Sequence, residues 1–355
     1  MTWLCHNPNP LVKLPSPPNK PLKHYMKPIL KKLLAGGLLL AGTLSHAQAL
    51  LNVSYDVSRE FYKDYNAAFV AHYKKTTGKD IKIDQSHAGS SAQARAVADG
   101  LDADVVTMNT TTDIEFLAEK GLVAKDWTKR FPNDASPTTS TMLFLVRNGN
   151  PKGIKDWDDL IKPGIQVVVV NPKTGGNGRM AYLAAWSYVR KKGGTDAQAA
   201  EFVGKLYKNV PVLARGGRDA TSVFLQRNIG DVLVTFESEV LSVDKEFGAG
   251  KVDAIHPSVS IIAENPVAVV ERTTAKKGSG ELAKAYLDFL YSEDGQEVAA
   301  QHAMRPRSAA LLKKYAATFK PLTLVPVSEY FGSLANAQKI HFNDGGQFDK
   351  LYTVK

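Results

Sequence analysis

Residues 166–192 read QVVVVNPKTGGNGRMAYLAAWSYVRKK, and this stretch carries the pattern that decides the fold. Four consecutive valines predict a strand covered on both faces, because β-branched residues favour strands and parallel sheets are buried on both sides. A glycine-containing turn at 173–178 follows, and a helical stretch begins at Arg179. A strand that enters a helix through such a turn is typical of α/β proteins.

The same strand-turn-helix order recurs along the chain, so we predict an α/β fold. Five further runs are strand-like: LLNVSY (50–55), KIDQS (82–86), ADVVTM (103–108), PVLA (211–214) and DVLVTFESE (231–239). A helix after the first of them carries Phe61, Tyr65, Phe69 and Tyr73 on one face, because residues four apart lie one above the other.

A chain of 355 residues is longer than one core ordinarily serves, so two lobes are expected. The long apolar stretch 141–151 is predicted to cross between the lobes, and 265–271 to return. These crossings assign 50–139 plus 263–355 to lobe I and 140–262 to lobe II. The tail 338–352 is expected to pack on lobe I.

The N-terminal residues 1–49 are predicted to be a signal peptide. They hold six lysines and no acidic residue, and the apolar run LLAGGLLLAGTL precedes Ala47-Gln48-Ala49, a small-residue cleavage pattern. We place the true start at Met26, so Cys5, the single cysteine, is absent from the mature chain. Without the leader the net charge falls from +10 to +4, an ordinary balance that gives no support to a nucleic-acid-binding function.

Four strand-to-helix junctions are candidate anion sites: 56–58, 87–91, 173–178 and 215–218. Ligands of open α/β sheets bind where parallel strands end, and helix N-termini offer unpaired N–H groups with a partial positive charge. Each junction taken alone is also explained as an ordinary helix cap. Four in one chain favour a binding site built from converging helix N-termini.

Catalytic and metal-binding chemistry finds little support in the sequence. The mature histidines are scattered and form no HxxxH pair, and no Gly-x-Ser-x-Gly elbow or Walker loop is present. His87 lies in a candidate loop, where a capping role explains it equally well. We therefore expect no enzyme activity, no catalytic residue, no metal and no cofactor.

At these junctions the sequence resembles the periplasmic sulfate- and thiosulfate-binding proteins of ABC importers. The matching stretches are LLNVSYDVSREFY, IDQSHAGSSAQA, STMLFLVRNGNPK, KDWDDLIKPG, NPKTGGNGR, YLAAWSY, GDVLVTFESE, AYLDFLYSEDGQEVAA and MRPR. The resemblance implies a two-lobed type II periplasmic binding protein fold with the ligand in the inter-lobe cleft. It also implies a monomer in the periplasm that delivers its ligand to the permease subunits of an ABC transporter at the inner membrane.

The resemblance further implies that backbone N–H groups and neutral side chains hold the anion, without a direct salt bridge. Matched motif by motif, the ligand-binding positions are Asp56, Ser90, Gly175, Gly176, Asn177, Gly217 and Phe236. Ser91, Arg179 and Arg218 are expected to support them from behind. The Asp56 carboxylate is expected to turn away from the anion, toward a basic neighbour such as Arg179 or Arg218.

Two positions depart from typical sulfate binders of that family. Gly175 stands where serine is common, and Phe236 stands where sulfate binders have tryptophan and thiosulfate-binding relatives have phenylalanine. Each departure removes one hydrogen-bond donor, and a bond to a charged group contributes about 1.5–3 kcal/mol. An apolar ring suits the larger terminal sulfur of thiosulfate, so this pattern favours thiosulfate, with sulfate as a second ligand.

Two other hypotheses remain open at this point. A secreted hydrolase or transferase acting on sulfate or phosphate esters is compatible with the fold, because folds host many chemistries. The second hypothesis is a periplasmic protein that binds molybdate or an organic ligand. Turnover of an aryl ester would support the first, and displacement of sulfur oxyanions by molybdate or an amino acid would support the second.

Overall fold

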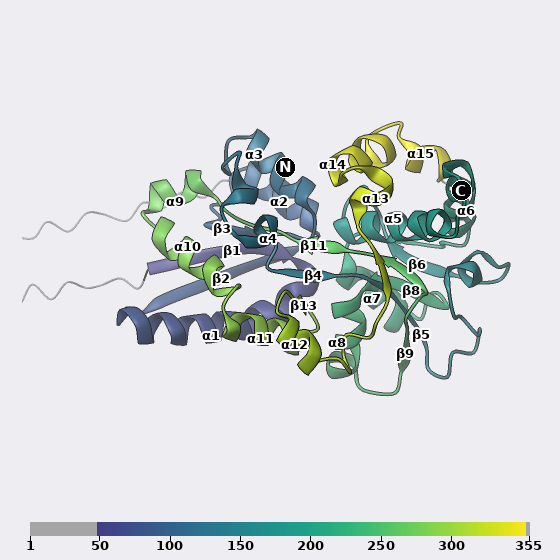
Figure 1. Cartoon of the computed structure of the whole chain (residues 1–355), viewed down its shortest axis with the longest axis horizontal. Helices are drawn as coiled ribbons and strands as arrows, with labels where there is room; N and C mark the ends of the chain where they lie inside the picture. The colour runs from purple at the N-terminus through teal and green to yellow at the C-terminus, as the bar shows by residue number, and fades with distance from the viewer. Residues whose placement is uncertain (1–47, 353–355) are drawn as a thin grey trace, which may run out of the picture. The chain divides into compact units, whose positions relative to one another are not determined.

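The computed structural model describes residues 48–352, apart from the side chains of 244–246 (Figure 1). Most of the predicted signal peptide falls on residues 1–47 and so lies outside the described residues. Its last two positions, Gln48 and Ala49, are the first residues of strand β1, which begins two residues earlier than predicted. None of the helices described is both long and apolar enough to cross a membrane.

The first sheet has the strand order β12-β3-β1-β2, with β1, β2 and β3 parallel and β12 antiparallel to β3. Its strands are β1 (Gln48–Tyr55), β2 (Ile81–Ala88), β3 (Val105–Thr107) and β12 (Val267–Val269). Its helices are α1 (Arg59–Thr77), α2 (Ser90–Ala98), α3 (Thr111–Glu119), α9 (Glu271–Lys277), α10 (Gly280–Phe289) and α11 (Glu293–Gln301). The predicted face of α1 is confirmed, because Phe61, Tyr65, Phe69 and Tyr73 are all buried.

The second sheet has the order β7-β6-β8-β5-β9, in which β6, β7 and β8 run parallel. Its strands are β5 (Met142–Arg147), β6 (Val167–Val170), β7 (Leu213–Ala214), β8 (Val232–Phe236) and β9 (Val252–Ile255). Its helices are α5 (Gly176–Lys191), α6 (Asp196–Lys208), α7 (Gly217–Leu225) and α8 (Glu237–Phe247). All four valines of β6 are buried, as predicted.

A small three-stranded sheet lies where the chain passes between the two larger ones (Figure 1). It consists of β11 (Ala263–Asn265), β4 (Thr138–Ser140) and β13 (Arg305–Pro306), in that order and antiparallel. The chain leaves the first sheet through β4 and continues into β5, and it returns through β11 into β12. We call these three strands the hinge sheet. A second pair, β10 (Val259–Ile261) and β14 (Thr323–Val325), is parallel.

The C-terminal helices differ in position from the prediction. These are α13 (Val327–Phe331), α14 (Leu334–Ala337), η4 (Gln338–Phe342) and α15 (Gln347–Leu351). They lie mainly over α5 and α6, not over the first sheet, although α14 also contacts α3 (Figure 1). The reason is an aromatic surface on α5 and α6, where Tyr182 and Tyr207 contact the rings of Phe342 and Phe348.

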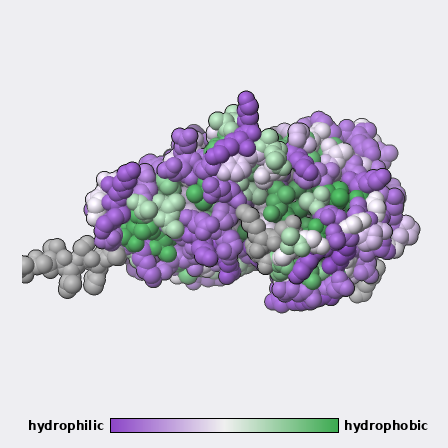
Figure 2. Space-filling model, turned by 90° about the horizontal axis from the view of Figure 1, so that it is seen from below, coloured by the Kyte–Doolittle hydropathy of each residue, from purple (hydrophilic) through white to green (hydrophobic). Residues whose placement is uncertain are grey.

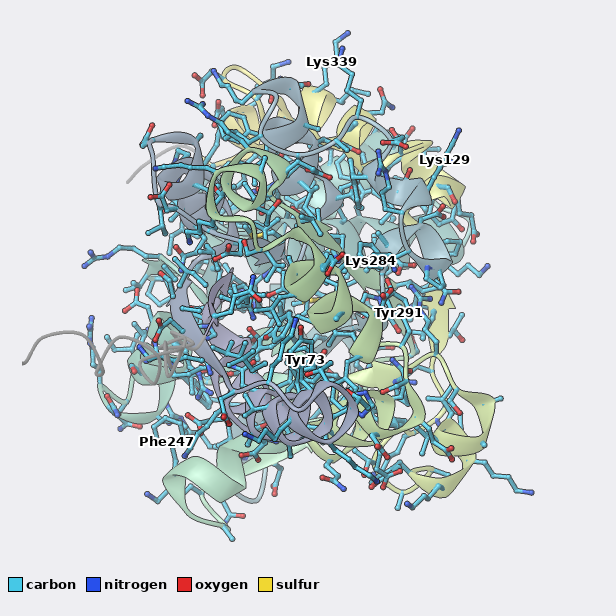
Figure 3. The ribbon with its side chains drawn as sticks, turned by 90° about the vertical axis from the view of Figure 1, so that its left-hand side faces the viewer. Tyr73, Lys129, Phe247, Lys284, Tyr291 and Lys339 are labelled. Carbon is cyan, nitrogen blue, oxygen red and sulfur yellow. The ribbon has the colours of Figure 1, made fainter. Side chains whose placement is uncertain are left out.

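The remaining elements are short: η1 (Asp56–Ser58), η2 (Trp127–Lys129), α4 (Pro132–Ala135), η3 (Trp157–Ile161) and α12 (Ala309–Lys314). The face of the molecule seen in Figure 2 is mostly hydrophilic, with apolar residues gathered in separate patches. In Figure 3 the side chains of Lys129 and Lys339 point away from the molecule, whereas Tyr73, on the inner face of α1, is buried.

Candidate functional site

The four predicted junctions are all strand-to-helix junctions in the structure. The chain passes from β1 into η1, from β2 into α2, from β6 into α5 and from β7 into α7. Because β1 and β2 are parallel neighbours, their carboxyl ends share one edge of the first sheet. The ends of β6 and β7 likewise share one edge of the second sheet.

The two edges face each other at contact distance. The Oδ2 atom of Asp56, after β1, accepts a hydrogen bond of 3.0 Å from the backbone N–H of Arg218, in the first turn of α7. A Cβ atom built on Gly216 would lie 3.8 Å from the Cα atom of Gly89. One built on Gly89 would lie 3.4 Å from the carbonyl oxygen of Arg215. The predicted junctions of the two sheets therefore meet in this structure.

Ser90 is the first residue of α2, and its side chain is buried. Its hydroxyl group accepts the backbone N–H of Asn109 at 3.3 Å and lies 3.5 Å from the sulfur of Met108, to which it donates. An anion bound at Ser90 would therefore compete with Met108 for the hydroxyl proton. A thioether sulfur is only a weak acceptor, so this exchange is favourable.

The glycine turn before α5 lies against the first sheet. Gly175 is the N-cap residue, with an extended backbone, and Gly176 is the first residue of the helix. A Cβ atom on Gly176 would lie 2.1 Å from Oδ1 of Asn109 and 2.2 Å from Cγ2 of Thr110, so only glycine permits this approach. Asn177 is buried, and its amide nitrogen donates to Oγ1 of Thr235 at 2.9 Å.

Asp56 lies between the two sheets, and its carboxylate is oriented by backbone groups. Oδ1 accepts the N–H of Val57 at 3.1 Å, while Oδ2 accepts the N–H of Arg218. Burial raises the pKa of Asp56, and the N–H groups of Arg218, Asp56 and Val57 oppose that rise. The carboxylate meets the N-terminus of α7 through the backbone N–H of Arg218, and the positive charge of the Arg218 side chain, one of the two expected basic neighbours, also opposes the rise in its pKa.

Phe236 ends β8 and is almost completely buried. Its ring packs edge-on against Tyr55, the last residue of β1, with 6.5 Å between the ring centroids. The phenolic hydroxyl of Tyr55 donates to the sulfur of Met304 at 3.6 Å. The contact of Phe236 with Tyr55 joins the end of β8 to the end of β1.

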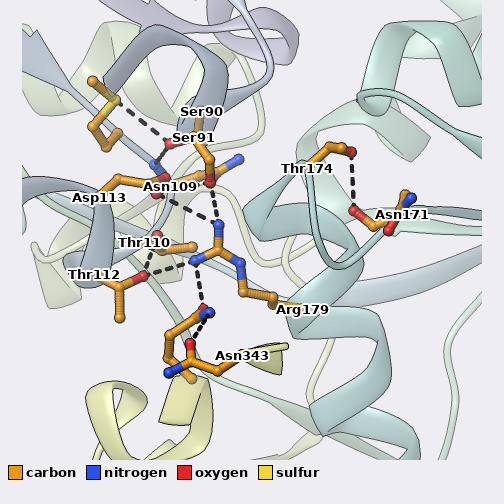
Figure 4. A network of polar contacts seen from close by, with 12 residues as sticks. Ser90, Ser91, Asn109, Thr110, Thr112, Asp113, Asn171, Thr174, Arg179 and Asn343 are labelled. Atoms are coloured by element: carbon orange, nitrogen blue, oxygen red, sulfur yellow. Dashed lines mark hydrogen bonds and ion pairs between the residues drawn. The ribbon is translucent and has the colours of Figure 1, made fainter. Parts of the chain in front are cut away.

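Arg179 joins α5 to the helices of the first sheet (Figure 4). Its guanidinium group donates to the Ser91 hydroxyl and, at 2.8 Å, to Oγ1 of Thr112. It also lies 3.5 Å from Oδ1 of Asp113, and both side chains of this ion pair are buried. A further bond of 3.2 Å reaches Oε1 of Gln338. Arg179 thus connects both sheets and the C-terminal segment.

Sequence analysis did not identify the segment 109–113 as part of this site. It follows β3, whose carboxyl end lies at the same edge as those of β1 and β2 because the three strands are parallel. Thr110 is the N-cap residue of α3, so this is another strand-to-helix junction. The signal was available in the sequence, since Asn109-Thr110 directly follows the strand-like run 103–108.

The donors of the site are neutral groups and helix N-termini. His87 lies beside them, and burial lowers its pKa, which favours the neutral ring. No group of three or more metal-ligating side chains occurs among the residues that the structure describes. Such an arrangement can hold an anion through dipoles aimed at one point, without a fixed positive charge.

Comparisons with known proteins agree with this fold. The family described as "Bacterial extracellular solute-binding protein" matches residues 53–305, so the chain belongs to the bacterial extracellular solute-binding proteins. It is 55% identical to the thiosulfate-binding protein of Pseudomonas aeruginosa, over 90% of this chain and 97% of that protein. It is 49% identical to the sulfate-binding protein of Escherichia coli strain K12, over 88% of this chain and 96% of that protein.

A solved structure supports the same assignment. The sulfate-binding protein SubI from Mycobacterium tuberculosis H37Rv aligns with a TM-score of 0.74 and 31% identity, covering 81% of this chain and 98% of SubI. The two-lobed solute-binding fold predicted from the sequence is therefore confirmed. The relatives are named for binding and not for catalysis, which favours the binding-protein hypothesis over the hydrolase alternative.

Proposed function

We propose that the protein captures thiosulfate, with sulfate as a second ligand, and delivers it to the permease subunits of an ABC importer. The observation that carries the proposal is the meeting of the junctions at Asp56, Ser90, Gly176 and Gly217 with neutral donors around them. The relatives named as thiosulfate- and sulfate-binding proteins support this class of ligand. The protein acts in the periplasm, after removal of the leader 1–49, as a monomer.

In the proposed site the dianion is held by the N–H groups of Asp56, Gly175, Gly176, Asn177 and Gly217, together with the Ser90 hydroxyl. The N–H of Gly175 donates to the carbonyl oxygen of Asn171 at 3.1 Å in this structure, so it must exchange that bond to reach the anion. Phe236 provides an apolar wall beside them. Ser91, Arg179 and Arg218 orient these groups from outside, as the contacts of Arg179 with Ser91 illustrate. Helix N-termini stabilise negative charge, so several of them aimed at one point offset the cost of burying a dianion.

The same geometry supports discrimination against phosphate. Sulfate and thiosulfate are fully deprotonated at neutral pH, whereas phosphate carries a proton that needs an acceptor. The two oxygens of the Asp56 carboxylate already accept N–H groups from Val57 and Arg218. A protonated oxyanion would therefore find as acceptors only the remaining lone pairs of a carboxylate that these two bonds hold in place.

The proposed lobes follow the crossings at the hinge sheet. Lobe I comprises 50–139 with 263–326, and lobe II comprises 140–262. We add the C-terminal helices from 327 onward to lobe II, because they lie mainly over α5 and α6.

Isothermal titration calorimetry with thiosulfate, sulfate and phosphate tests the proposal directly. We expect saturable binding of thiosulfate and sulfate and no competition by phosphate at equal concentration. A preference for phosphate, or the absence of any oxyanion binding, contradicts the proposed function. Hydrolysis of an aryl sulfate or aryl phosphate would instead revive the enzyme hypothesis.

A further inference from the structure

The segment Met304-Arg305-Pro306-Arg307 lies at the hinge, next to both sides of the candidate site. Its strand β13 pairs with β4, one of the two strands through which the chain crosses between the sheets. The preceding residue, Met304, is buried and accepts the hydroxyl of Tyr55, the residue before Asp56. The segment is thus in contact with the end of β1.

Arg305 extends from this segment to the other side of the site. Its guanidinium group forms two hydrogen bonds with the carboxylate of Glu237, 2.5 Å from Nε to Oε2 and 2.8 Å from Nη2 to Oε1. The Glu237 side chain is completely buried, and that of Arg305 is 12% exposed. Such a bidentate pair fixes the orientation of both groups as well as neutralising their charges.

Glu237 directly follows Phe236 and is the first residue of α8. Its backbone N–H donates to the carbonyl oxygen of Thr141 at 2.8 Å, in the connection between β4 and β5. The end of β8 is therefore held at two points, by the backbone through Thr141 and by the side chain through Arg305. Because Phe236 lies next to Glu237, movement of the Glu237 carboxylate would displace the ring that faces Tyr55.

The ion pair of Arg305 with Glu237 also affects the charge next to the bound anion. An uncompensated carboxylate at Glu237 would repel a dianion bound beside Phe236. Burial raises the pKa of Glu237, and the nearby Arg305 opposes that rise. A buried charge whose partner is removed is strongly unfavourable, so loss of Arg305 affects the geometry and the charge of the site together.

We infer that Arg305 is a positioning residue for anion capture, which acts through Glu237 on Phe236 and on the approach of the two sheets. The inference rests on the proposed function, because its effect is read in ligand affinity. Arg307, two residues further on, serves as a matched control. It pairs with Glu264 on β11 and donates at 2.9 Å to the carbonyl oxygen of Ser136, so its contacts remain at the hinge.

The experiment measures thiosulfate affinity by calorimetry in the full chain and in the variants R305Q, R305K, E237Q, R305Q/E237Q and R307Q. We expect R305Q to raise Kd fivefold or more, whereas R307Q changes it less than fivefold. The double variant removes the uncompensated carboxylate, so its Kd should be lower than that of R305Q. Urea unfolding without ligand tests whether the role of Arg305 is only structural. In that case R305Q would lower the free energy of unfolding and leave the Kd of the folded protein unchanged.

The outcomes are distinguishable. A wild-type protein that binds no oxyanion contradicts the proposed function, whereas a wild type and R305Q that differ less than fivefold in Kd contradict this inference alone. An R307Q effect as large as that of R305Q also contradicts it, because the cause would be a general weakening of the hinge. If circular dichroism shows R305Q to be unfolded, the double variant decides the matter because it leaves no uncompensated carboxylate, and wild-type affinity in R305Q/E237Q overturns the inference.

Discussion

The Oδ2 atom of Asp56 accepts the backbone N–H of Arg218 at 3.0 Å, and this bond joins the edge of the first sheet to the edge of the second. The two residues are 162 positions apart in the chain. A short helical turn after β1 and the N-terminus of α7 therefore act together, and their contact defines the closed arrangement of the candidate site.

Replacement of Asp56 tests this bond. We expect Asp56→Ala to raise the Kd for thiosulfate about tenfold, because a hydrogen bond to a charged group contributes roughly 1.5–3 kcal/mol and a tenfold change corresponds to about 1.4 kcal/mol. Asp56→Asn keeps an oxygen acceptor, so its Kd should stay within about threefold of the wild type. Calorimetry at pH 7 makes the comparison. Equal losses in the two variants would show that the negative charge itself is required.

Gly176→Ala should impair ligand binding without unfolding the protein. The added methyl group would overlap Asn109 and Thr110, which belong to the opposite sheet, so the two sheets could not approach as closely. We expect at least a tenfold increase in Kd, while the thermal midpoint of the ligand-free protein stays near that of the wild type. A variant that binds normally would show that this approach is not needed for capture.

Gly178→Ala is the matched control for that experiment. Its methyl group would lie 2.3 Å from the carbonyl oxygen of Val170 and 2.7 Å from the nitrogen of Pro172, both backbone atoms of the strand and turn that precede α5. Opening of the two sheets cannot relieve this clash, so the ligand-free protein should lose thermal stability. Differential scanning fluorimetry of both glycine variants, with and without thiosulfate, separates the two effects.

The double variant Gly175→Ser with Phe236→Trp should shift preference toward sulfate. Both changes add a donor that typical sulfate binders of the family possess. The extended backbone of Gly175 suits a serine, and its Cβ atom requires Cγ1 of Val170, 3.1 Å away, to shift by a few tenths of an ångström. We expect the ratio of thiosulfate to sulfate affinity to fall about tenfold. An unchanged ratio, measured by competition calorimetry, would show that donor number does not set selectivity.

The low pKa of His341 predicts that the folded protein loses stability in acid. Burial lowers the pKa of His341 to about 4, against about 6.5 in an unfolded chain. The neutral ring is favoured in the folded state, so this stability is present above pH 6.5 and is lost as the pH falls toward 4. The expected loss is about 2 kcal/mol between pH 7 and pH 5.

Urea unfolding at pH 7 and pH 5 measures this loss, and His341→Phe provides the comparison. The variant has no titrating ring between Tyr182 and Trp186. Its unfolding free energy should therefore change less between the two pH values than that of the wild type. The same change in both proteins would assign the acid sensitivity to another group.

Much of the fold and part of the site could be predicted from local sequence. Valine runs indicated the strands, and the aromatic spacing indicated the buried face of α1, because both patterns depend on residues close in the chain. The tail helices were placed on the wrong elements, since the aromatic surface that receives them is formed by two helices far away in the sequence. The segment 109–113 was missed although its junction directly follows a strand-like run in the sequence, and the order of the strands in the sheet places that junction at the site.

By itself the sequence determined which segments become strands and helices, where glycine turns begin helices, and which family the chain resembles. These features depend on local backbone preferences and on motifs that can be compared directly. Only the tertiary structure decided that Asp56 meets the backbone of Arg218, that Gly176 touches Asn109 and that Arg305 pairs with Glu237. Each of these contacts joins residues distant in the chain, and their distances follow from the packing of the two sheets at the hinge.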